Sequence, residues 1–545
     1  MWRSCESIPR RPDVRTDEHP TANERPATSR GVSLAPRTRI MANSIYSLAS
    51  YVVYLPVSLF LSSYVVHRLG IVQYGIWATL TALLGYGSLL DLGLSSPVIR
   101  YVAEYMALGQ RAEVNSLVNT ALVCYACLGS TGAAVMIAGS GWALTHLFRA
   151  QHETVVYQLY IVVAIGFAVS LTFSVFQSLV IGMQRSDLFA RVTLALNLVT
   201  AAITILAVHA GMGISGLALT WAVSICLTIT ANLILAKRLF PGLVINPLLF
   251  RFDVLKLIWR YGSRIQVTSL TLVLNDQVDR TLIAYALGPA SLGYFSLGSR
   301  VAAALRGVSF SLLAGIMPAA SDASAVDQQE RLKLLYLRSA RYVNIADFGL
   351  CAGVGGLAYP LITAWLGLGY GRIAATLIVI LVGYIVWLPS QAASDILNGA
   401  GRPEIRMRAD LAFLLIHIPL STFLIWRFGY FGTLVGTSAA LSVTRIYVYV
   451  VGSRLLGVTL AELCHFSVVQ PALGSLLALT VVVVPQVAGV SYSFWALLAG
   501  ITAFVTVYAV YILKFGLDEY DCNLLRAHVL PTLRRIVSPF QRVTQ

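Results

Sequence analysis

Long apolar runs alternate with short polar stretches along almost the whole chain after residue 43. Each run is about 20 residues or longer, the length that an α-helix needs to cross the hydrocarbon core of a bilayer. We therefore predict about fourteen membrane-spanning helices. These lie near residues 44–66, 75–97, 116–140, 154–180, 189–209, 213–236, 263–287, 293–317, 340–366, 373–397, 409–427, 430–452, 466–487 and 490–513.

The composition supports this interpretation of the apolar pattern. Hydrophobic residues make up 57% of the chain and charged residues only 12%, whereas soluble domains are roughly 45–50% apolar and about 25% charged. A transmembrane barrel would show alternating segments of about ten residues rather than continuous apolar runs. The predicted fold is an all-α polytopic membrane protein.

Basic residues are distributed unevenly among the predicted loops. This distribution predicts which side of the membrane each loop faces. The loops that follow even-numbered spans hold most of the basic residues: Arg111, Arg185, Arg191, Lys237, Arg238, Arg251, Lys256, Arg260, Arg264, Arg331, Lys333, Arg338, Arg341, Arg402, Arg406 and Arg408. The opposite loops hold only Arg68, Arg149, Arg372 and Arg427. Both termini are predicted to be cytoplasmic, and the net charge of +15 is a topology signal rather than a sign of nucleic-acid binding.

Two terminal segments differ from the apolar body of the chain. Residues 1–40 are rich in Pro, Arg, Ser and Thr and lack an apolar signal segment, so we predict a disordered cytoplasmic tail. Either Met1 or Met41 fits as the start of the protein. Residues 514–545 are basic with apolar residues at helical spacing, which predicts an amphipathic cytoplasmic tail along the membrane surface.

An internal repeat divides the body of the chain. Glycine landmarks recur from Gly70 to Gly288, from Gly182 to Gly399 and from Gly213 to Gly429, at offsets of 218, 217 and 216 residues. Such a parallel repeat is typical of transporters whose two halves rock around a central site. We predict a six-helix lobe at 41–238, a cytoplasmic linker at 239–261, a second six-helix lobe at 262–455 and two added helices at 456–513.

The same landmarks carry a resemblance to a known family. Leu69-Gly-Ile-Val-Gln-Tyr-Gly-Ile-Trp77, Asp91-Leu-Gly-Leu94 and Gln277-Val-Asp-Arg280 followed by Leu287-Gly288 resemble the motifs of Wzx-type polysaccharide and O-antigen flippases. The resemblance covers about residues 41–515. It implies the multidrug/oligosaccharidyl-lipid/polysaccharide exporter fold in a bacterial inner membrane. The implied cargo is a lipid-linked (undecaprenyl-pyrophosphate) oligosaccharide, and the other implied partners are membrane lipids, coupling H⁺ or Na⁺, a polysaccharide polymerase and other pathway proteins.

Charged residues within the predicted spans are the candidate functional residues, because ionisable groups are costly in a bilayer. Spans 7 and 8 contribute the substrate-cavity candidates Asp276, Asp279, Arg280, Arg300 and Arg306. Asp279 with Arg300, or Asp276 with Arg306, are the pairs that antiparallel helices allow. Two interpretations stay open: the charges neutralise each other and join the helices, or the arginines line a cavity for a pyrophosphate or acidic sugar.

Other candidate chemistry is weaker. Asp347 and Asp395 are coupling-ion candidates, although a polar packing contact also explains them. Cys124 and Cys127 have metal-motif spacing, but no further ligands lie nearby, so we expect neither a metal nor a cofactor.

Three alternative functions were weighed against a polysaccharide flippase. An enzyme of the same pathway is disfavoured because the predicted outward loops are short and hold no cluster of carboxylates or histidines. An ion-coupled multidrug antiporter would share the fold but would favour a neutral or acidic cavity. A lipid II flippase would use the same chemistry on a different sugar.

Overall fold

The computed structural model describes residues 37–91, 93–149, 154–313, 315–325, 328–488 and 493–524. All regular structure within these ranges is helical, which confirms the predicted all-α class. The predicted tail at 1–40 lies outside the described residues except for 37–40, which begin the first helix. Most of the predicted amphipathic tail at 514–545 also lies outside them.

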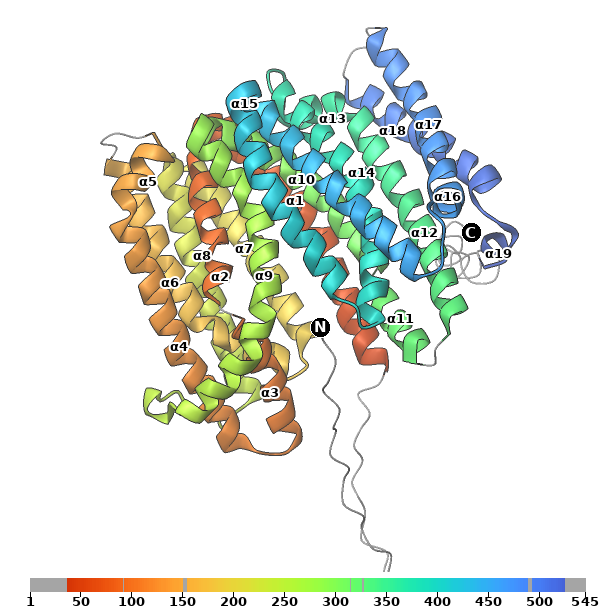
Figure 1. Cartoon of the computed structure of the whole chain (residues 1–545). Coiled ribbons are helices and arrows are strands. Elements are labelled where there is room, and N and C mark those ends of the chain that lie inside the picture. The colour runs from red at the N-terminus through yellow and green to blue at the C-terminus, as the bar shows by residue number, and fades with distance from the viewer. Residues whose placement is uncertain are drawn as a thin grey trace, which may run out of the picture.

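The helices follow the predicted order along the chain (Figure 1). The first half contains α1 (Arg37–Gly85), α2 (Gly87–Leu90), α3 (Ser95–Ala107), α4 (Arg111–Ala138), α5 (Ser140–His146), α6 (Thr154–Gly182), α7 (Ser186–His209) and α8 (Gly213–Leu239). The second half contains a 3-10 turn (Pro247–Leu249), α9 (Phe252–Leu287), α10 (Pro289–Leu313), α11 (Ile316–Ala325), α12 (Gln329–Gly356), α13 (Ala358–Leu366), α14 (Gly371–Gly399) and α15 (Glu404–Leu455). The added segment contains α16 (Leu460–Leu463), α17 (Val469–Val487), α18 (Phe494–Tyr511) and α19 (Glu519–Leu524), with π-helical turns at Cys464–Val468 and Ile512–Gly516.

The predicted fourteen spans correspond to fewer helices in the structure, because some helices hold two of them. Among the described residues ten helices are long and apolar enough to span a bilayer, and α12 with α13, bent by 61°, makes an eleventh. Two of these helices are each broken into two legs, α1 at Gly70 and α15 at Gly429. Counting the legs separately and adding α9, which is long but more polar, makes fourteen.

The second predicted span is not continuous. The 75–97 segment breaks after Gly85, forms the short α2, and resumes as α3 at Ser95. Asp91 at this break accepts hydrogen bonds from Tyr125 (2.5 Å) and Ser95 (3.0 Å), so its carboxylate fastens the broken segment to α4. A half-buried side-chain network thus holds the two pieces of the broken span against α4.

The repeat predicted from the glycines appears in the backbone. Gly70 and Gly288, which end the first helix of each half, have almost the same dihedral angles (φ 79°, ψ 165° and φ 85°, ψ 175°). These angles lie in a region that is open to glycine but not to residues with a Cβ atom. The two halves therefore reverse direction through the same turn.

The repeat mates Gly75 and Gly293 meet where the two halves touch. A Cβ atom on Gly75 would overlap the carbonyl oxygen of Pro289, and one on Gly293 would lie 2.9 Å from the carbonyl oxygen of Ile71. Each half thus contributes the same glycine against the backbone of the other, as expected for two lobes related by a pseudo-twofold axis.

Among the described residues, two apolar clusters contain residues of both lobes, and both include residues near one end of the bundle. We call this the tight-turn end; it contains Gly70, Gly288 and Gly429, and in Figure 1 it lies at the top, near α5 and α13. Buried residues of both lobes, including Leu80, Phe148, Ile283, Leu292 and Leu434, form one apolar cluster there.

The opposite end, near α3 and α11 in Figure 1, is called the basic end because its connections hold residues such as Arg185, Arg251 and Arg402. Here the buried residues form two separate clusters, one in the first half and one in the second. The first cluster also takes in Val254 and Ile258. The segment predicted as a linker (239–261) is therefore helical from Phe252, and its helical part packs in the first lobe.

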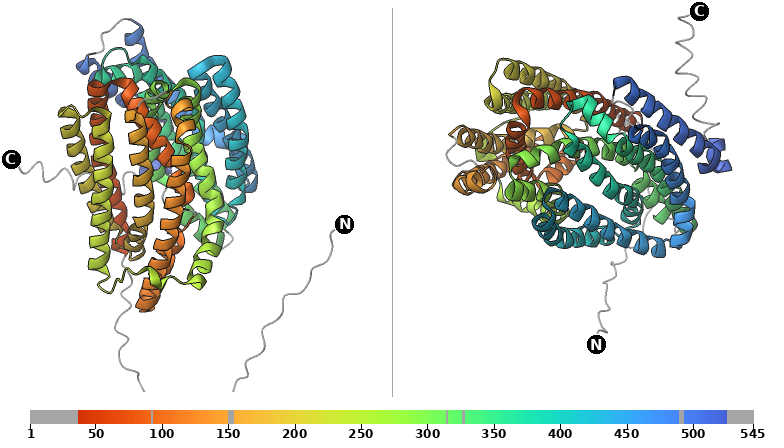
Figure 2. Two further views of the ribbon diagram at one scale, coloured as in Figure 1. Left: turned by 90° about the vertical axis from the view of Figure 1, so that its left-hand side faces the viewer. Right: turned by 90° about the horizontal axis from the view of Figure 1, so that it is seen from above.

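The two added helices pack on the outside of the second lobe (Figure 2). The Tyr508 hydroxyl on α18 donates to the carbonyl oxygen of Ile345 on α12 at 2.7 Å, and Gln486 on α17 donates to that of Gly356 at 2.9 Å. Because the two added helices attach to α12, they do not cover the central site that the repeat predicts between the two halves.

Candidate functional site

A polar cavity of about 690 Å³ lies within the second lobe, between α9, α10, α14 and both legs of α15. Its lining includes seven ionisable side chains: Asp276, Asp279, Arg280, Arg306, Arg406, Asp410 and Arg445. Four of them are arginines and three are aspartates. So many charges at one place in a membrane bundle are typical of a substrate or ion pathway.

The predicted arginines of spans 7 and 8 have different surroundings. Arg306 pairs with Asp276 at 3.4 Å, one of the two pairs that the sequence allowed. Arg280 lines the cavity but forms no ion pair within the described residues. Arg300 is outside this cavity and donates to the carbonyl oxygen of Ser58 (3.3 Å) and to the Ser62 hydroxyl on α1.

Asp279 belongs to a buried network that joins three helical legs. Its Oδ1 atom accepts from the Thr437 hydroxyl at 2.7 Å and from His417 Nε2 at 2.8 Å. The His417 side chain is fully buried, and Phe413 stacks on its ring at 4.8 Å. The Nδ1 atom of His417 has no hydrogen-bond partner within the described residues. The Asp279 carboxylate therefore holds the imidazole through one ring nitrogen and leaves the other facing the interior of the bundle.

A second buried pair lies in the part of the cavity nearer the basic end. Arg445 donates through Nη2 to Asp410 at 2.6 Å, and both side chains are almost completely buried. The Nε and Nη1 atoms of Arg445 have no partner within the described residues. Because unpaired buried donors are costly, these N–H groups favour an anionic ligand at this position.

One wall of the cavity is aromatic. Trp387 contacts Tyr384 at 5.1 Å and Phe310 at 6.2 Å between ring centroids, and the Arg306 guanidinium lies 5.8 Å from the Trp387 ring. Aromatic rings with a few placed polar groups are typical of pockets that orient an organic ligand. The cavity therefore offers both cationic donors and flat apolar surface.

The predicted coupling-ion candidates lie outside this lining. Asp347 on α12 is completely buried and accepts a hydrogen bond from Ser309 on α10. Asp395 on α14 pairs with Arg406 at 3.5 Å. Of the predicted residues, the structure brings together Asp276, Asp279, Arg280 and Arg306 and leaves Arg300, Asp347 and Asp395 apart.

Sequence reasoning missed the residues that α15 contributes. Asp410, His417 and Arg445 lie in or beside predicted spans 11 and 12, so the argument used for spans 7 and 8 applies to them equally. The spacing of Asp410 and His417, seven residues apart, also places them on one helical face. The signal was present, but only the fold shows that α15 and α9 face the same cavity.

Comparison with known families agrees with this architecture. The family described as "Polysaccharide biosynthesis protein" matches residues 65–375, more than half of the chain. The chain belongs to this family. No curated protein matches the sequence.

Several solved transporters share the fold. One is an inward-facing multidrug resistance MATE family transporter of the MOP superfamily (16% identity, 76% of this chain and 98% of that chain, TM-score 0.61). Another is the lipid II flippase MurJ in its inward closed conformation (14% identity, 87% and 98%, TM-score 0.63). A third is a Vibrio cholerae MATE transporter (13% identity, 77% and 97%, TM-score 0.52). At these identities the likeness concerns the fold, and all three neighbours are transporters or flippases rather than enzymes.

Proposed function

We propose that this family member is a flippase for an undecaprenyl-pyrophosphate-linked oligosaccharide. It moves the lipid-linked sugar across the bacterial inner membrane by alternating access of the two lobes, for surface polysaccharide or O-antigen synthesis. The basic end and both termini face the cytoplasm, because the positively charged loops gather there. A polysaccharide polymerase of the same pathway is the expected recipient of the cargo.

This proposal rests on two arginines of the cavity whose guanidinium groups are not fully paired among the described residues. Arg280 has no ion-pair partner among the described residues, and Arg445 keeps two N–H groups unused. Guanidinium groups match the oxygens of phosphate in geometry and charge. The aromatic wall at Trp387 adds a flat surface against which a sugar ring packs.

Two members of the same superfamily remain as alternatives. A multidrug antiporter for cationic drugs is less well supported, because arginines outnumber aspartates in the cavity lining. A lipid II flippase uses the same pyrophosphate chemistry and differs only in the sugar. For both alternatives, we expect the His417–Asp279 contact to be the place where transport is coupled to H⁺ or Na⁺.

The proposal is tested by deleting the gene in its native bacterium and complementing it with variants. Deletion is expected to cause lipid-linked oligosaccharide to accumulate with its sugar facing the cytoplasm, while surface polysaccharide falls. Arg280→Ala is expected to restore export at a tenth of the wild-type level or less, since a charged hydrogen bond is worth roughly 1.5–3 kcal/mol. Arg280→Lys is expected to restore part of it, because the charge remains but the planar donor fork is lost.

Arg300→Ala is the matched control, because Arg300 bonds to α1 and does not line the cavity. It is expected to restore export fully at equal protein level. Full export by Arg280→Ala would contradict the anion-binding role. Normal surface glycan in the deletion strain, with greater sensitivity to cationic drugs, would favour the antiporter instead.

A further inference from the structure

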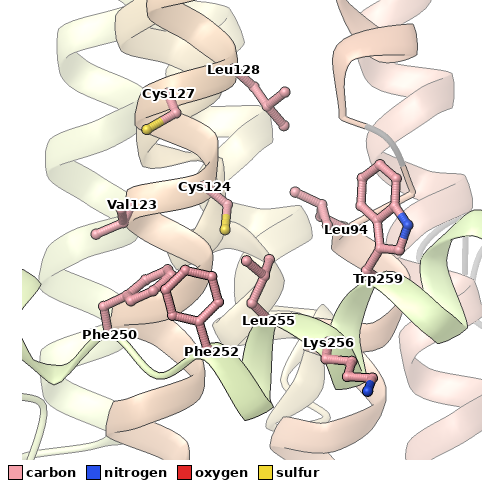
Figure 3. A pocket seen from close by; sticks show the side chains of 10 residues that line it. All are labelled: Leu94, Val123, Cys124, Cys127, Leu128, Phe250, Phe252, Leu255, Lys256 and Trp259. Atoms are coloured by element: carbon pink, nitrogen blue, oxygen red, sulfur yellow. The ribbon is translucent and has the colours of Figure 1, made fainter.

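A second pocket lies well away from the charged cavity, between α4 and the first turns of α9. It has a volume of about 520 Å³, and Figure 3 shows Cys124 and Cys127 on one side, with Leu255 and Trp259 among the residues facing them. We call this pocket the α4–α9 groove. Of the residues that line it, Lys256 is the one that carries a charge.

The groove opens onto the outer surface of the protein. Phe252 is 78% exposed and Trp259 is 51% exposed, and Cys127 is also exposed. Apolar side chains exposed on a membrane-spanning bundle are suited to contact lipid. Because α9 begins at Phe252, the groove lies close to the basic end, where the lipid headgroups of one leaflet begin.

A set of polar contacts holds this part of the chain in place. Asn115 on α4 donates to the Gly242 carbonyl at 2.9 Å and accepts from the Val244 amide at 3.0 Å. Asn119, one turn further on, donates to the Val244 carbonyl at 2.7 Å and accepts from the Asn246 amide at 2.8 Å. These hydrogen bonds attach the connection between the lobes to α4. They thereby position Phe250 and Phe252 along one side of the groove.

We propose that the α4–α9 groove binds one acyl chain of an anionic phospholipid, whose phosphate rests on the Lys256 ammonium. The groove has a volume of about 520 Å³, and all but one of the side chains that line it are uncharged, which suits a single hydrocarbon chain rather than a whole lipid. The single cation beside apolar walls matches the charge and shape of such a lipid. The occupant that we assign is therefore a phospholipid of the bulk membrane, and the experiments below distinguish it from a polyprenyl lipid.

The first experiment measures lipid binding to the purified full-length protein by native mass spectrometry. Dioleoyl phosphatidylglycerol is expected to bind as one retained molecule, more tightly than the zwitterionic dioleoyl phosphatidylcholine. Lys256→Ala is expected to weaken phosphatidylglycerol binding roughly fivefold, as for the loss of one lysine at an anionic surface. Lys237→Ala is the control, because Lys237 lies in the last turn of α8 at the same end but outside the groove.

The second experiment uses the native cysteines as reporters. Cys127 in the groove and Cys226 on α8 are both exposed, so general shielding by micelle or lipid affects both. Adding phosphatidylglycerol is expected to slow alkylation of Cys127 at least threefold relative to Cys226, as read by peptide mass spectrometry. Leu255→Trp, which fills the groove, is expected to remove the retained lipid while an unchanged melting temperature shows that the protein is folded.

Three results would overturn the proposal. One is equal phosphatidylglycerol binding by the wild type, Lys256→Ala and a folded Leu255→Trp variant. Another is equal slowing of Cys127 and Cys226 by lipid. The third is displacement of phosphatidylglycerol by an equimolar amount of undecaprenyl phosphate, which would assign the groove to the cargo lipid.

Discussion

At the residue scale, the contact between His417 and Asp279 is a buried polar contact that joins three helical legs. The imidazole is fully buried, its Nε2 atom lies 2.8 Å from the carboxylate, and Thr437 bonds to the same oxygen. The three residues belong to α9 and to both legs of α15, so the contact joins helices that lie far apart in sequence. Losing either partner of this contact removes a link between those helices.

A double-mutant cycle tests whether His417 and Asp279 are energetically coupled. His417→Ala and Asp279→Asn are each expected to destabilise the protein, and the double variant less than the sum of the two. The expected coupling energy is about 1 kcal/mol or more, since contacting polar residues couple by roughly 0.5–3 kcal/mol and membrane hydrogen bonds lie toward the lower part of that range. Thermal unfolding in detergent measures it.

His67→Gln serves as the control in the same background, because His67 is exposed and bonds only within its own helix, to Ser63, among the described residues. Strict additivity of the His417 and Asp279 effects would show that the observed contact contributes nothing to stability.

At the element scale, glycines decide where helices end and how closely they cross. Gly70, Gly288 and Gly429 all have positive φ and turn the chain back between paired helices. Gly75 and Gly293 act differently, because they lie inside helices and let the two lobes touch backbone to backbone. Small residues are the usual means of close helix packing in a membrane, where apolar burial alone gives no preference.

Alanine at either crossing glycine is expected to separate the lobes locally. Gly75→Ala and Gly293→Ala are each expected to destabilise the protein by about 1–3 kcal/mol through overpacking. Gly355→Ala is the control: it lies in α12, where a Cβ atom would meet only Leu381 at an ordinary 3.8 Å. That variant is expected to be neutral or slightly stabilising, since alanine favours the helix. Equal melting temperatures for all three variants would contradict the close crossing.

At the scale of the whole molecule, the described residues of both lobes share two apolar clusters toward the tight-turn end, whereas the clusters at the basic end belong to one lobe each apart from the first turns of α9. Arg149 crosses between the lobes at the joined end, donating to the carbonyl oxygen of Ala286 at 2.5 Å. Tyr285 of the second lobe stacks with Trp142 and His146 of the first. The structure is therefore closed at the tight-turn end, the state expected of a transporter that loads from the basic end.

Removing the Arg149 contact is expected to favour opening of the closed end. Ala284→Cys places a thiol in the shared core, at a position only 2% exposed. Labelling of this thiol by a water-soluble maleimide is expected to rise roughly three- to tenfold when Arg149→Ala is added, as for the loss of one exposed hydrogen bond worth about 1 kcal/mol. Arg68→Ala at the same end is the control, because Arg68 lies against Tyr64 of its own helix. An unchanged labelling rate would show that Arg149 does not hold the end closed.

Much of the fold was predictable because its causes are local. The apolar runs specify membrane helices whatever their neighbours do, and the repeated glycines specify matching turns in both halves. The break in the second predicted span was not predictable, since it depends on Asp91 finding Tyr125 on another helix. The helical start of α9 within the predicted linker likewise depends on Val254 and Ile258 packing in the first lobe.

For the candidate site, the sequence alone predicted that charged residues of spans 7 and 8 lie at membrane depth, because they stand within or between long apolar runs. Only the tertiary structure decided their partners: Arg306 meets Asp276, Asp279 meets His417, and Arg300 turns to α1. The physical reason is that a helix fixes the direction of each side chain along its own axis, but its rotation and its neighbours are set by packing between helices. Whether a segment of this chain enters the membrane therefore depends on its local sequence. Which residues line the cavity depends on how the helices of the whole molecule pack.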